Sequence, residues 1–193
     1  MIRKILSYTI LFFESILFFL VTSLLLLRLT VFNVSYIEKK FEDNKYYDNL
    51  YNEIKTEMSY YTNQSGFNDD ILDDIFTVSE VKSSVNKIIN NTYKGISTDI
   101  NTDKLKEKFN EKIEDYIKDN NYEEVNEKEI TTFIDKMASI YSDEIKLMNY
   151  TDKVSSIISK IINIVDEVLI ISILLLIVLV VLNAKLFHRR YLS

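Results

Sequence analysis

The chain has 193 residues, with two Gly, no Pro, no Cys and one His, and its formal net charge is −6. The lack of Cys excludes disulfides, Cys nucleophiles and Cys zinc sites, and a single His excludes His-rich metal sites. Few turn residues are available for sheets, so the composition favours helices joined by polar turns. We therefore expect an all-α protein.

The charge is unevenly distributed along the chain. Between Tyr36 and Asn163 there are 26 Asp and Glu against 17 Lys, a local net of −9, whereas both ends are basic. Binding of nucleic acid needs a clustered Lys and Arg surface that attracts phosphate. The acidic middle of the chain therefore argues against a nucleic-acid partner.

A long apolar segment lies close to the N-terminus. The run from Ile5 to Leu27, ILSYTILFFESILFFLVTSLLLL, contains a single charge, Glu14. A helix of this length extends about 34 Å, enough to cross a hydrocarbon core of about 30 Å. A cleaved signal peptide is the alternative, but its apolar run is only about 7–15 residues and a small-residue cleavage site follows it. Neither feature is present, so we predict an uncleaved transmembrane helix in residues 5–34.

A second apolar segment lies near the C-terminus. It runs from Val168 to Leu182, VLIISILLLIVLVVL, and a shorter apolar stretch precedes Asp166 and Glu167. Its length and composition predict a second transmembrane helix in residues 161–184. The rest of the chain is then divided into two tails, 1–4 and 185–193, and a central domain, 35–160.

Basic residues beside the two spans predict the topology. Cytoplasmic flanks of membrane helices are enriched in Lys and Arg. Such residues precede the first span and follow the second: Arg3, Lys4, Lys185, Arg189 and Arg190. We therefore expect both termini in the cytoplasm and the central domain on the outer side of the cell (plasma) membrane.

Charged residues at the outer ends of the two spans suggest a pairing. In the predicted topology, Arg28 ends the first span, and Asp166 and Glu167 lie at the outer end of the second. We hypothesise that Arg28 pairs with Asp166 or Glu167 and so joins the spans as a hairpin. The alternative is that each side chain extends separately to the lipid headgroups.

Glu14 is the unusual residue of the first span. It lies ten residues after Lys4, near mid-depth, where a carboxylate costs several kcal/mol unless it is paired or protonated. It is therefore protonated, or bonded to Ser172 or Asn183, or in contact with another chain. Two interpretations of Glu14 follow. It has a role in partner assembly or ion coupling, or it is an acid that the membrane helix merely tolerates.

The central domain has the apolar periodicity of amphipathic helices. Gly95 and the capping-box pattern Thr77–Glu80 bound one helix, and Asn126 opens another. We expect an extracytoplasmic helical bundle on a two-helix transmembrane hairpin, with the first and last helices continuing out of the lipid as stalks. The expected helices are one running on from the first span through Met58, a short one at 69–76, those over 78–94 and 105–116, one from Asn126 to Met148, and one from Val154 into the second span.

Two groups of side chains in the domain are candidate sites. Four Asp between Asp69 and Asp74 offer oxygens for Ca²⁺, but the Gly and the distal Glu of an EF-hand loop are missing, so we predict no metal site. Tyr46 and Tyr60 lie opposite the apolar stripe of their helix by helical angle. Exposed Tyr is favoured at interfaces, and these two residues are our predicted partner face; stray surface aromatics are the alternative.

Sequence motifs of enzymes are missing from the chain, which has no Gly-rich phosphate loop, GxSxG or HExxH. We therefore expect a non-enzymatic, cofactor-free, membrane-anchored protein-interaction or assembly module. Its partners would be membrane lipid and a protein or a second copy of the chain. The alternative is an extracytoplasmic ligand-sensing subunit. Because only eight residues, LFHRRYLS, follow Lys185, such a sensor would signal through a partner membrane protein.

Several local features lie between two spans in an order that suggests a family. They are Tyr36-Ile37, the pair Tyr46-Tyr47, the turn Ser65-Gly66-Phe67, Val81, and Tyr93 before Gly95. In this pattern, over about residues 1–185, the chain resembles an uncharacterised family of small helical membrane proteins of low-GC Gram-positive bacteria. The resemblance implies a bacterial source and a membrane location, and no activity.

Overall fold

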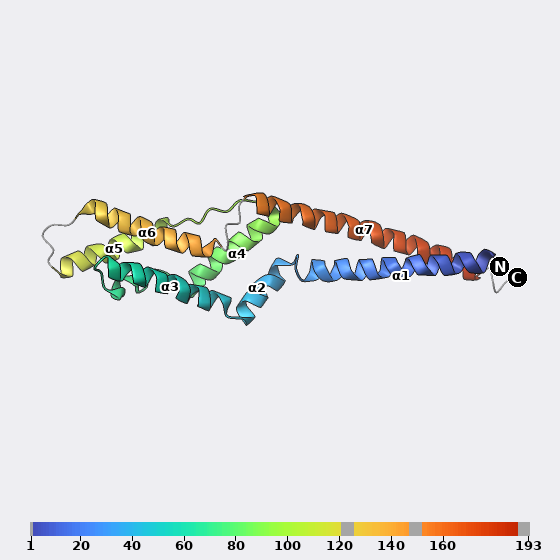
Figure 1. Cartoon of the computed structure of the whole chain (residues 1–193), viewed down its shortest axis with the longest axis horizontal. Coiled ribbons are helices and arrows are strands. Elements are labelled where there is room, and N and C mark those ends of the chain that lie inside the picture. Colours follow the sequence, from blue (N-terminus) through green and yellow to red (C-terminus); the bar gives the residue numbers. More distant parts are fainter. Residues whose placement is uncertain (1, 121–125, 147–151, 189–193) are drawn as a thin grey trace. The chain divides into compact units, whose positions relative to one another are not determined.

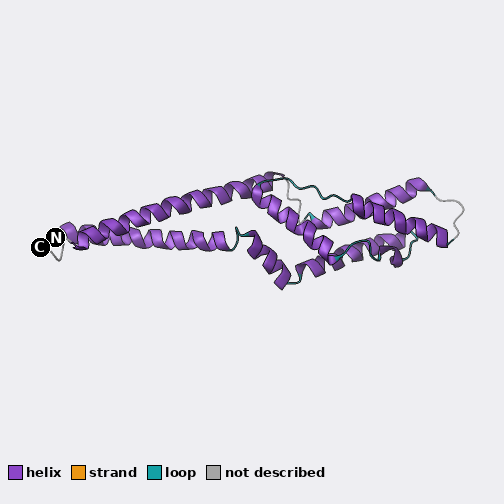
Figure 2. Ribbon diagram, turned by 180° about the vertical axis from the view of Figure 1, so that it is seen from behind, coloured by secondary structure: helices purple, strands orange, loops and turns teal. Residues whose placement is uncertain are grey.

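The computed structural model describes residues 2–120, 126–146 and 152–188, and in these residues all regular structure is helical (Figures 1 and 2). The all-α prediction is therefore confirmed for the described part of the chain. In chain order the elements are α1 (Ile2–Leu29), α2 (Val34–Asp43), α3 (Tyr46–Gln64), the 3-10 helix η1 (Asp69–Leu72), α4 (Val78–Lys94), α5 (Asp103–Asp119), α6 (Glu127–Ile145) and α7 (Asp152–His188).

The chain consists of two compact units. The first unit comprises Met1–Ile37 and Ile157–Ser193 and contains α1 and most of α7; we call it the hairpin unit after the arrangement predicted from the sequence. The domain unit comprises Glu38–Ser156, and it contains α3, η1, α4, α5 and α6. The residues of each unit pack mainly on other residues of the same unit.

The expected stalk on the first span is wrong, because α1 stops at Leu29. The Arg28 guanidinium donates a hydrogen bond from Nη1 to the carbonyl of Phe32 at 2.7 Å, which stabilises a turn after the helix. Asn33 then begins α2, since its side chain accepts a hydrogen bond from the amide of Tyr36 at 3.1 Å. Asn is a favoured helix-start residue, and this signal was overlooked in the sequence.

A second interruption separates α2 from α3. The side chain of Asn44 donates to the carbonyl of Lys40 at 2.7 Å, and Lys45 adopts a left-handed conformation with φ of 53°. A left-handed residue cannot continue an α-helix, so the chain changes direction at this point. The apolar positions on both sides had predicted one helix because a short break does not disturb their periodicity.

Of two other expected helices, one is confirmed and the other is shorter than predicted. The stripe beginning at Val154 predicted a helix that leads without a break into the second apolar segment, and α7 confirms it. The short helix expected at 69–76 is only the four-residue η1, after which the chain is extended at Asp73 and left-handed at Asp74, with φ of 61°. Met148, expected in the stripe of α6, lies outside the described residues.

The core of the domain unit is built around α3, which contacts α4, η1 and α6, while α5 contacts η1 and α6. Ile54 and Met58 of α3 are fully buried, and Leu50 is buried beside them. Burial of such side chains contributes roughly 1.5–3 kcal/mol each. The best-buried partners from the other helices are Val81, Val85, Phe109, Ile113, Met137 and Ile145.

The predicted capping box begins α4. The hydroxyl of Thr77 accepts from the amide of Glu80 at 3.2 Å, and the amide of Thr77 donates to the Glu80 carboxylate at 2.8 Å. Burial favours a higher pKa for Glu80, but hydrogen bonds from Lys108 and Thr77 outweigh it and lower the pKa. The helix ends at Gly95, whose φ of 71° suits glycine.

We expect Thr77→Ala to lower the free energy of unfolding of the domain unit by about 1 kcal/mol, because an amide at the start of α4 loses its acceptor. The measurement is denaturant unfolding of the full chain in non-ionic micelles, followed by circular dichroism. Thr56→Ala is the control, since this exposed hydroxyl bonds only to a carbonyl of its own helix. A cost no larger than that of the control would contradict the prediction.

A group of carboxylates lies where α6 packs on α3. Glu144 of α6 is half-buried, and Glu53 and Glu57 of α3 are its neighbours. Burial raises the pKa of the Glu144 carboxyl, and the acids Glu57, Glu53 and Asp143 raise it further. Because this pKa is higher in the folded state than in the unfolded chain, folding becomes more favourable as the pH falls through the folded pKa.

We predict that Glu144→Gln raises the free energy of unfolding at pH 7, on the order of 0.5 kcal/mol, because it removes repulsion at a partly exposed site. The gain should vanish well below the ordinary pKa of 4.5, where Glu144 is protonated in both states. Unfolding midpoints measured from pH 3 to pH 8 test this. An equal gain at both ends of the pH range would show that the effect does not depend on the charge of Glu144. An equal gain for the exposed Glu107→Gln would show that the repulsion is general.

Candidate functional site

Two helices are long and apolar enough to cross a membrane. They cover Lys4–Leu29, with a mean hydropathy of 2.5, and Ser155–Leu186, with a mean hydropathy of 3.0. Most of their large apolar side chains are exposed, including Phe19 and Phe12 on α1. Apolar surface is unfavourable in water by roughly 25 cal/mol per Å². These faces therefore require an apolar environment or apolar partners.

The buried and half-buried side chains of α1 form one row along the helix. They recur at alternating intervals of three and four residues, the spacing by which two helices pack along one face. Ser23 is half-buried beside the row. The row consists of Ser7, Ile10, Glu14, Leu17, Val21, Leu24 and Arg28.

The second helix carries a matching row. Within the hairpin unit, covered positions of α7 follow the same alternation, with Asp166 and Ile173 half-buried beside it. We call the two rows together the seam. The α7 row consists of Ile162, Val165, Leu169, Ser172, Leu176, Leu179, Asn183 and Leu186.

One end of the seam is closed by an ion pair. Nε of Arg28 lies 2.7 Å from Oδ1 of Asp166, and the two side chains are 40% and 38% exposed. Of the two acids considered in the sequence, the structure brings Asp166 to the arginine, while Glu167 is exposed. Because Arg28 also bonds to Phe32, it holds the end of α1, the following turn and α7 together.

Further along the seam, three polar side chains meet. Asn183 is 6% exposed; its Nδ2 donates to Oε2 of Glu14 at 3.2 Å, and its Oδ1 accepts from the hydroxyl of Ser7 at 3.1 Å. The other carboxyl oxygen, Glu14 Oε1, is buried and has no hydrogen-bond partner among the described residues. Of the partners considered for Glu14, the structure provides Asn183. Ser7 was missed, although its seven-residue spacing from Glu14 was the available signal.

These contacts define one antiparallel register. From Glu14 to Arg28, α1 advances by 14 residues, and from Asp166 to Asn183, α7 advances by 17 residues. The difference is less than one helical turn and is within the reach of the long side chains. The ion pair and the amide–carboxyl contact therefore belong to the same alignment of the two helices.

Polar residues of α1 away from the seam are satisfied differently. The hydroxyls of Thr9, Ser15 and Thr22 each donate to the carbonyl four residues earlier, at 2.8 to 3.0 Å. This local bond hides a hydroxyl from an apolar environment. Within residues 2–37 and 157–188, the cross-helix hydrogen bonds and the ion pair thus lie along the seam, and the outward faces are mostly apolar.

The other residues that the sequence singled out differ in their exposure to solvent. Lys4 and Lys185 are exposed, Arg3 lies in α1, and Arg189 and Arg190 lie outside the described residues. Tyr60 is 67% exposed, as a partner face requires. Tyr46 is half-buried instead, because its ring packs on Phe41 with centroids 4.4 Å apart.

The acidic segment at 69–74 is bonded to neighbouring donors. Oδ1 of Asp69 accepts from Ser59 at 2.7 Å and from Asn63 at 3.2 Å, and Asp73 pairs with Lys55 at 3.2 Å. Among the residues that the structure describes, no three acidic or His side chains gather as metal ligands do.

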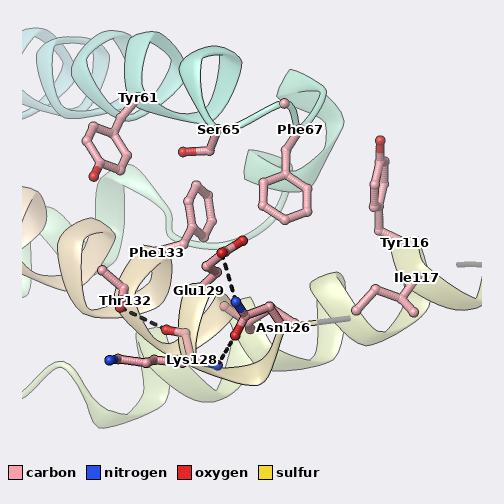
Figure 3. A pocket seen from close by; sticks show the side chains of 12 residues that line it. Tyr61, Ser65, Phe67, Tyr116, Ile117, Asn126, Lys128, Glu129, Thr132 and Phe133 are labelled. Carbon is pink, nitrogen blue, oxygen red and sulfur yellow. Dashed lines mark hydrogen bonds between the residues drawn. The ribbon is translucent and has the colours of Figure 1, made fainter. Parts of the chain in front are cut away.

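A groove of about 760 Å³ opens in the domain unit and was not anticipated from the sequence. It lies between the end of α3, the turn after it, the end of α5 and the start of α6 (Figure 3). Four of its twelve lining residues are aromatic, and their proximity depends on which helix ends meet. The main lining side chains are Tyr61, Phe67, Tyr116, Glu129 and Phe133.

Comparison of the chain with models of known protein families gives no match, and neither curated proteins nor solved structures include a similar one.

The register of the seam predicts which positions of α1 and α7 cross-link. Leu17 lies three residues from Glu14, and Leu179 lies four residues from Asn183, so the two face one another along the seam. We expect the double variant Leu17→Cys, Leu179→Cys to be linked within one chain by a short thiol-reactive reagent. The chain has no native Cys, so every link comes from the introduced pair. Mass spectrometry of peptides identifies the product.

The matched control is Phe19→Cys with Ile177→Cys. These positions lie at a similar level of the two helices but are 74% and 54% exposed, on the outward faces. Links within one chain that form as readily in the control as in the seam pair would contradict the proposed register.

Proposed function

We propose that this chain is a membrane-anchored protein-interaction or assembly module. In this proposal α1 and α7 cross the plasma membrane as a hairpin, both termini are cytoplasmic, and the acidic helical domain is outside. The activity is binding: the domain engages a protein or a second copy of the chain, and the hairpin packs beside other membrane helices.

The observation that carries the proposal is that the cross-helix polar contacts of the two apolar helices lie along the seam, whereas the outward faces are mostly apolar. A soluble hairpin would place its charged residues outward. Here the charged and amide groups Glu14, Asn183 and Arg28 lie along the seam, and most exposed positions are large apolar residues. This distribution is expected when the surrounding medium is lipid, where unpaired polar groups are costly.

Glu14 supports an assembly role for the hairpin. Only one of its two carboxyl oxygens is hydrogen-bonded, and buried half-satisfied polar groups are unfavourable in an apolar medium. A donor from a further membrane helix would remove that penalty after a small side-chain rearrangement. Polar side chains are common points of contact between membrane helices for this reason.

A second candidate function is extracytoplasmic ligand sensing. The observation in its favour is the aromatic groove, whose volume falls within the range of small-molecule sites, roughly 300–1,000 Å³. In this case the outer domain binds a ligand and a partner membrane protein transmits the signal.

Cross-linking on intact cells tests the topology and the partner together. A membrane-impermeant, amine-reactive cross-linker should reach the lysines of the central domain without lysis and trap the chain in a larger complex. Glu14→Leu should reduce the amount of complex severalfold, because the contact in the membrane is lost. Ser15→Ala is the matched control, since this neighbouring hydroxyl bonds only to its own helix. Immunoblotting and mass spectrometry measure the products.

Each failure has a distinct meaning. Reaction only after cell lysis would reverse the proposed topology. Release of the chain from membranes without detergent would overturn the anchoring. Equal complex formation by Glu14→Leu and Ser15→Ala would remove Glu14 from the assembly contact.

A further inference from the structure

The groove in the domain unit joins segments that are distant in sequence. It is lined by the end of α3, the turn at Ser65–Phe67, the end of α5 and the first turns of α6. All the side chains named below belong to the described part of the chain. The site is therefore a product of tertiary packing.

Aromatic rings form one wall of this groove. The ring of Phe67 lies at its centre, with centroid distances of 4.9 Å to Phe133 and 5.4 Å to Tyr116. Tyr61 continues the wall at 6.4 Å from Phe133. The rings meet edge-on or tilted; Tyr61, Phe67 and Tyr116 are half-buried, so parts of these rings border the groove, whereas Phe133 is only 4% exposed. Such faces carry partial negative charge and attract cations.

The chain already contains one contact of this kind. Nζ of Lys136 lies 5.7 Å from the centroid of the Tyr61 ring, within the range of a cation–π interaction. Lys136 does not line the groove, so it meets the ring from beside the site. One ring of the aromatic wall, Tyr61, is thus already paired with an ammonium group of the chain itself.

Glu129 adds a full negative charge to the groove. Figure 3 shows its carboxyl group pointing toward the rings of Phe67 and Phe133, whereas the side chain of Lys128 points away from them. Oε1 of Glu129 accepts a hydrogen bond from Nδ2 of Asn126 at 2.8 Å, which fixes its direction. The single cationic residue of the lining therefore does not neutralise this carboxylate inside the groove.

The start of α6 does not favour an anion here. Its N-terminal end carries partial positive charge, but the first turn holds the acids Glu127 and Glu129. The amide of Lys128 already donates to the side chain of Asn126 at 3.2 Å. The wider domain is acidic as well, with a net charge of −9 between Tyr36 and Asn163. Glu129 is therefore the charged side chain of the lining that faces the rings.

We propose that this groove binds a small organic cation, an ammonium group carried on an apolar body. The ammonium is held by the carboxylate of Glu129 and the face of Phe67, and the apolar body lies along Tyr61, Phe133 and Tyr116. The volume of about 760 Å³ is larger than a bare ammonium needs, so the site accommodates such a body. This inference names the ligand class of the second candidate function, and the binding itself requires neither the hairpin nor a partner.

Three probes of similar size separate charge from apolar contact: 2-phenylethylammonium, 2-phenylethanol and phenylacetate. They are titrated by calorimetry into the full chain in non-ionic micelles. We expect the ammonium to bind most tightly, the alcohol less tightly and the carboxylate least. Glu129→Gln should weaken binding of the ammonium by about three- to tenfold and leave the alcohol unchanged. The substitution keeps an oxygen to accept from Asn126, so the start of α6 is preserved.

Glu127→Gln is the matched control, because it removes an acid from the same helical turn without altering the groove lining. It should change the affinity for the ammonium less than twofold. Phe67→Leu should weaken the ammonium more than the alcohol, and helicity by circular dichroism verifies that this variant is folded.

Several outcomes would overturn the proposal. They are the lack of saturable ammonium binding, tighter binding of phenylacetate, or equal losses for Glu129→Gln and Glu127→Gln. Because the measurement is made on isolated chain in micelles, such a failure leaves the cross-linking result on cells unaffected. Loss of the cross-linked complex would likewise leave this binding result intact.

Discussion

The register of the hairpin unit depends on the hydrogen bond between Asn183 and Glu14, because apolar packing alone does not select one alignment of two apolar helices. Leu, Ile and Val side chains fit one another at many offsets. An amide that bonds to Glu14 on one side and Ser7 on the other is satisfied at only one offset. The ion pair of Arg28 with Asp166 lies at a distance along both helices that agrees with this offset. Polar contacts thus specify the register that apolar contacts stabilise.

The domain unit is organised by a different constraint. Its helices are short, so each is stable only when its apolar face is covered. The helix α3 packs against α4, η1 and α6 through buried residues such as Ile54 and Met58. Local signals such as the capping box of Thr77 and Glu80 set where a helix begins, and packing on α3 sets its direction. The ends of these helices leave the aromatic groove open, since Phe67 in a turn can cover only part of it.

The two units suggest a division of labour that is consistent with the proposed function. The seam uses its polar groups internally and leaves apolar faces for lipid or other helices. The domain has an acidic surface, an exposed Tyr60 and a groove with a carboxylate among aromatic rings. In the proposed function, recognition of a partner or ligand would depend on the domain unit, and placement in the membrane would depend on the hairpin unit.

The sequence by itself determined the helical class, the two apolar segments, the capped start of α4 and the two acids from which Arg28 takes its partner, since these depend on composition, periodicity and local spacing. Only the tertiary structure decided that the arginine meets Asp166 and that Glu14 bonds to Asn183. It also decided that Phe67, Tyr116 and Glu129 share one groove. The physical reason is that these contacts join residues far apart in the chain, and their distances follow from how whole helices pack.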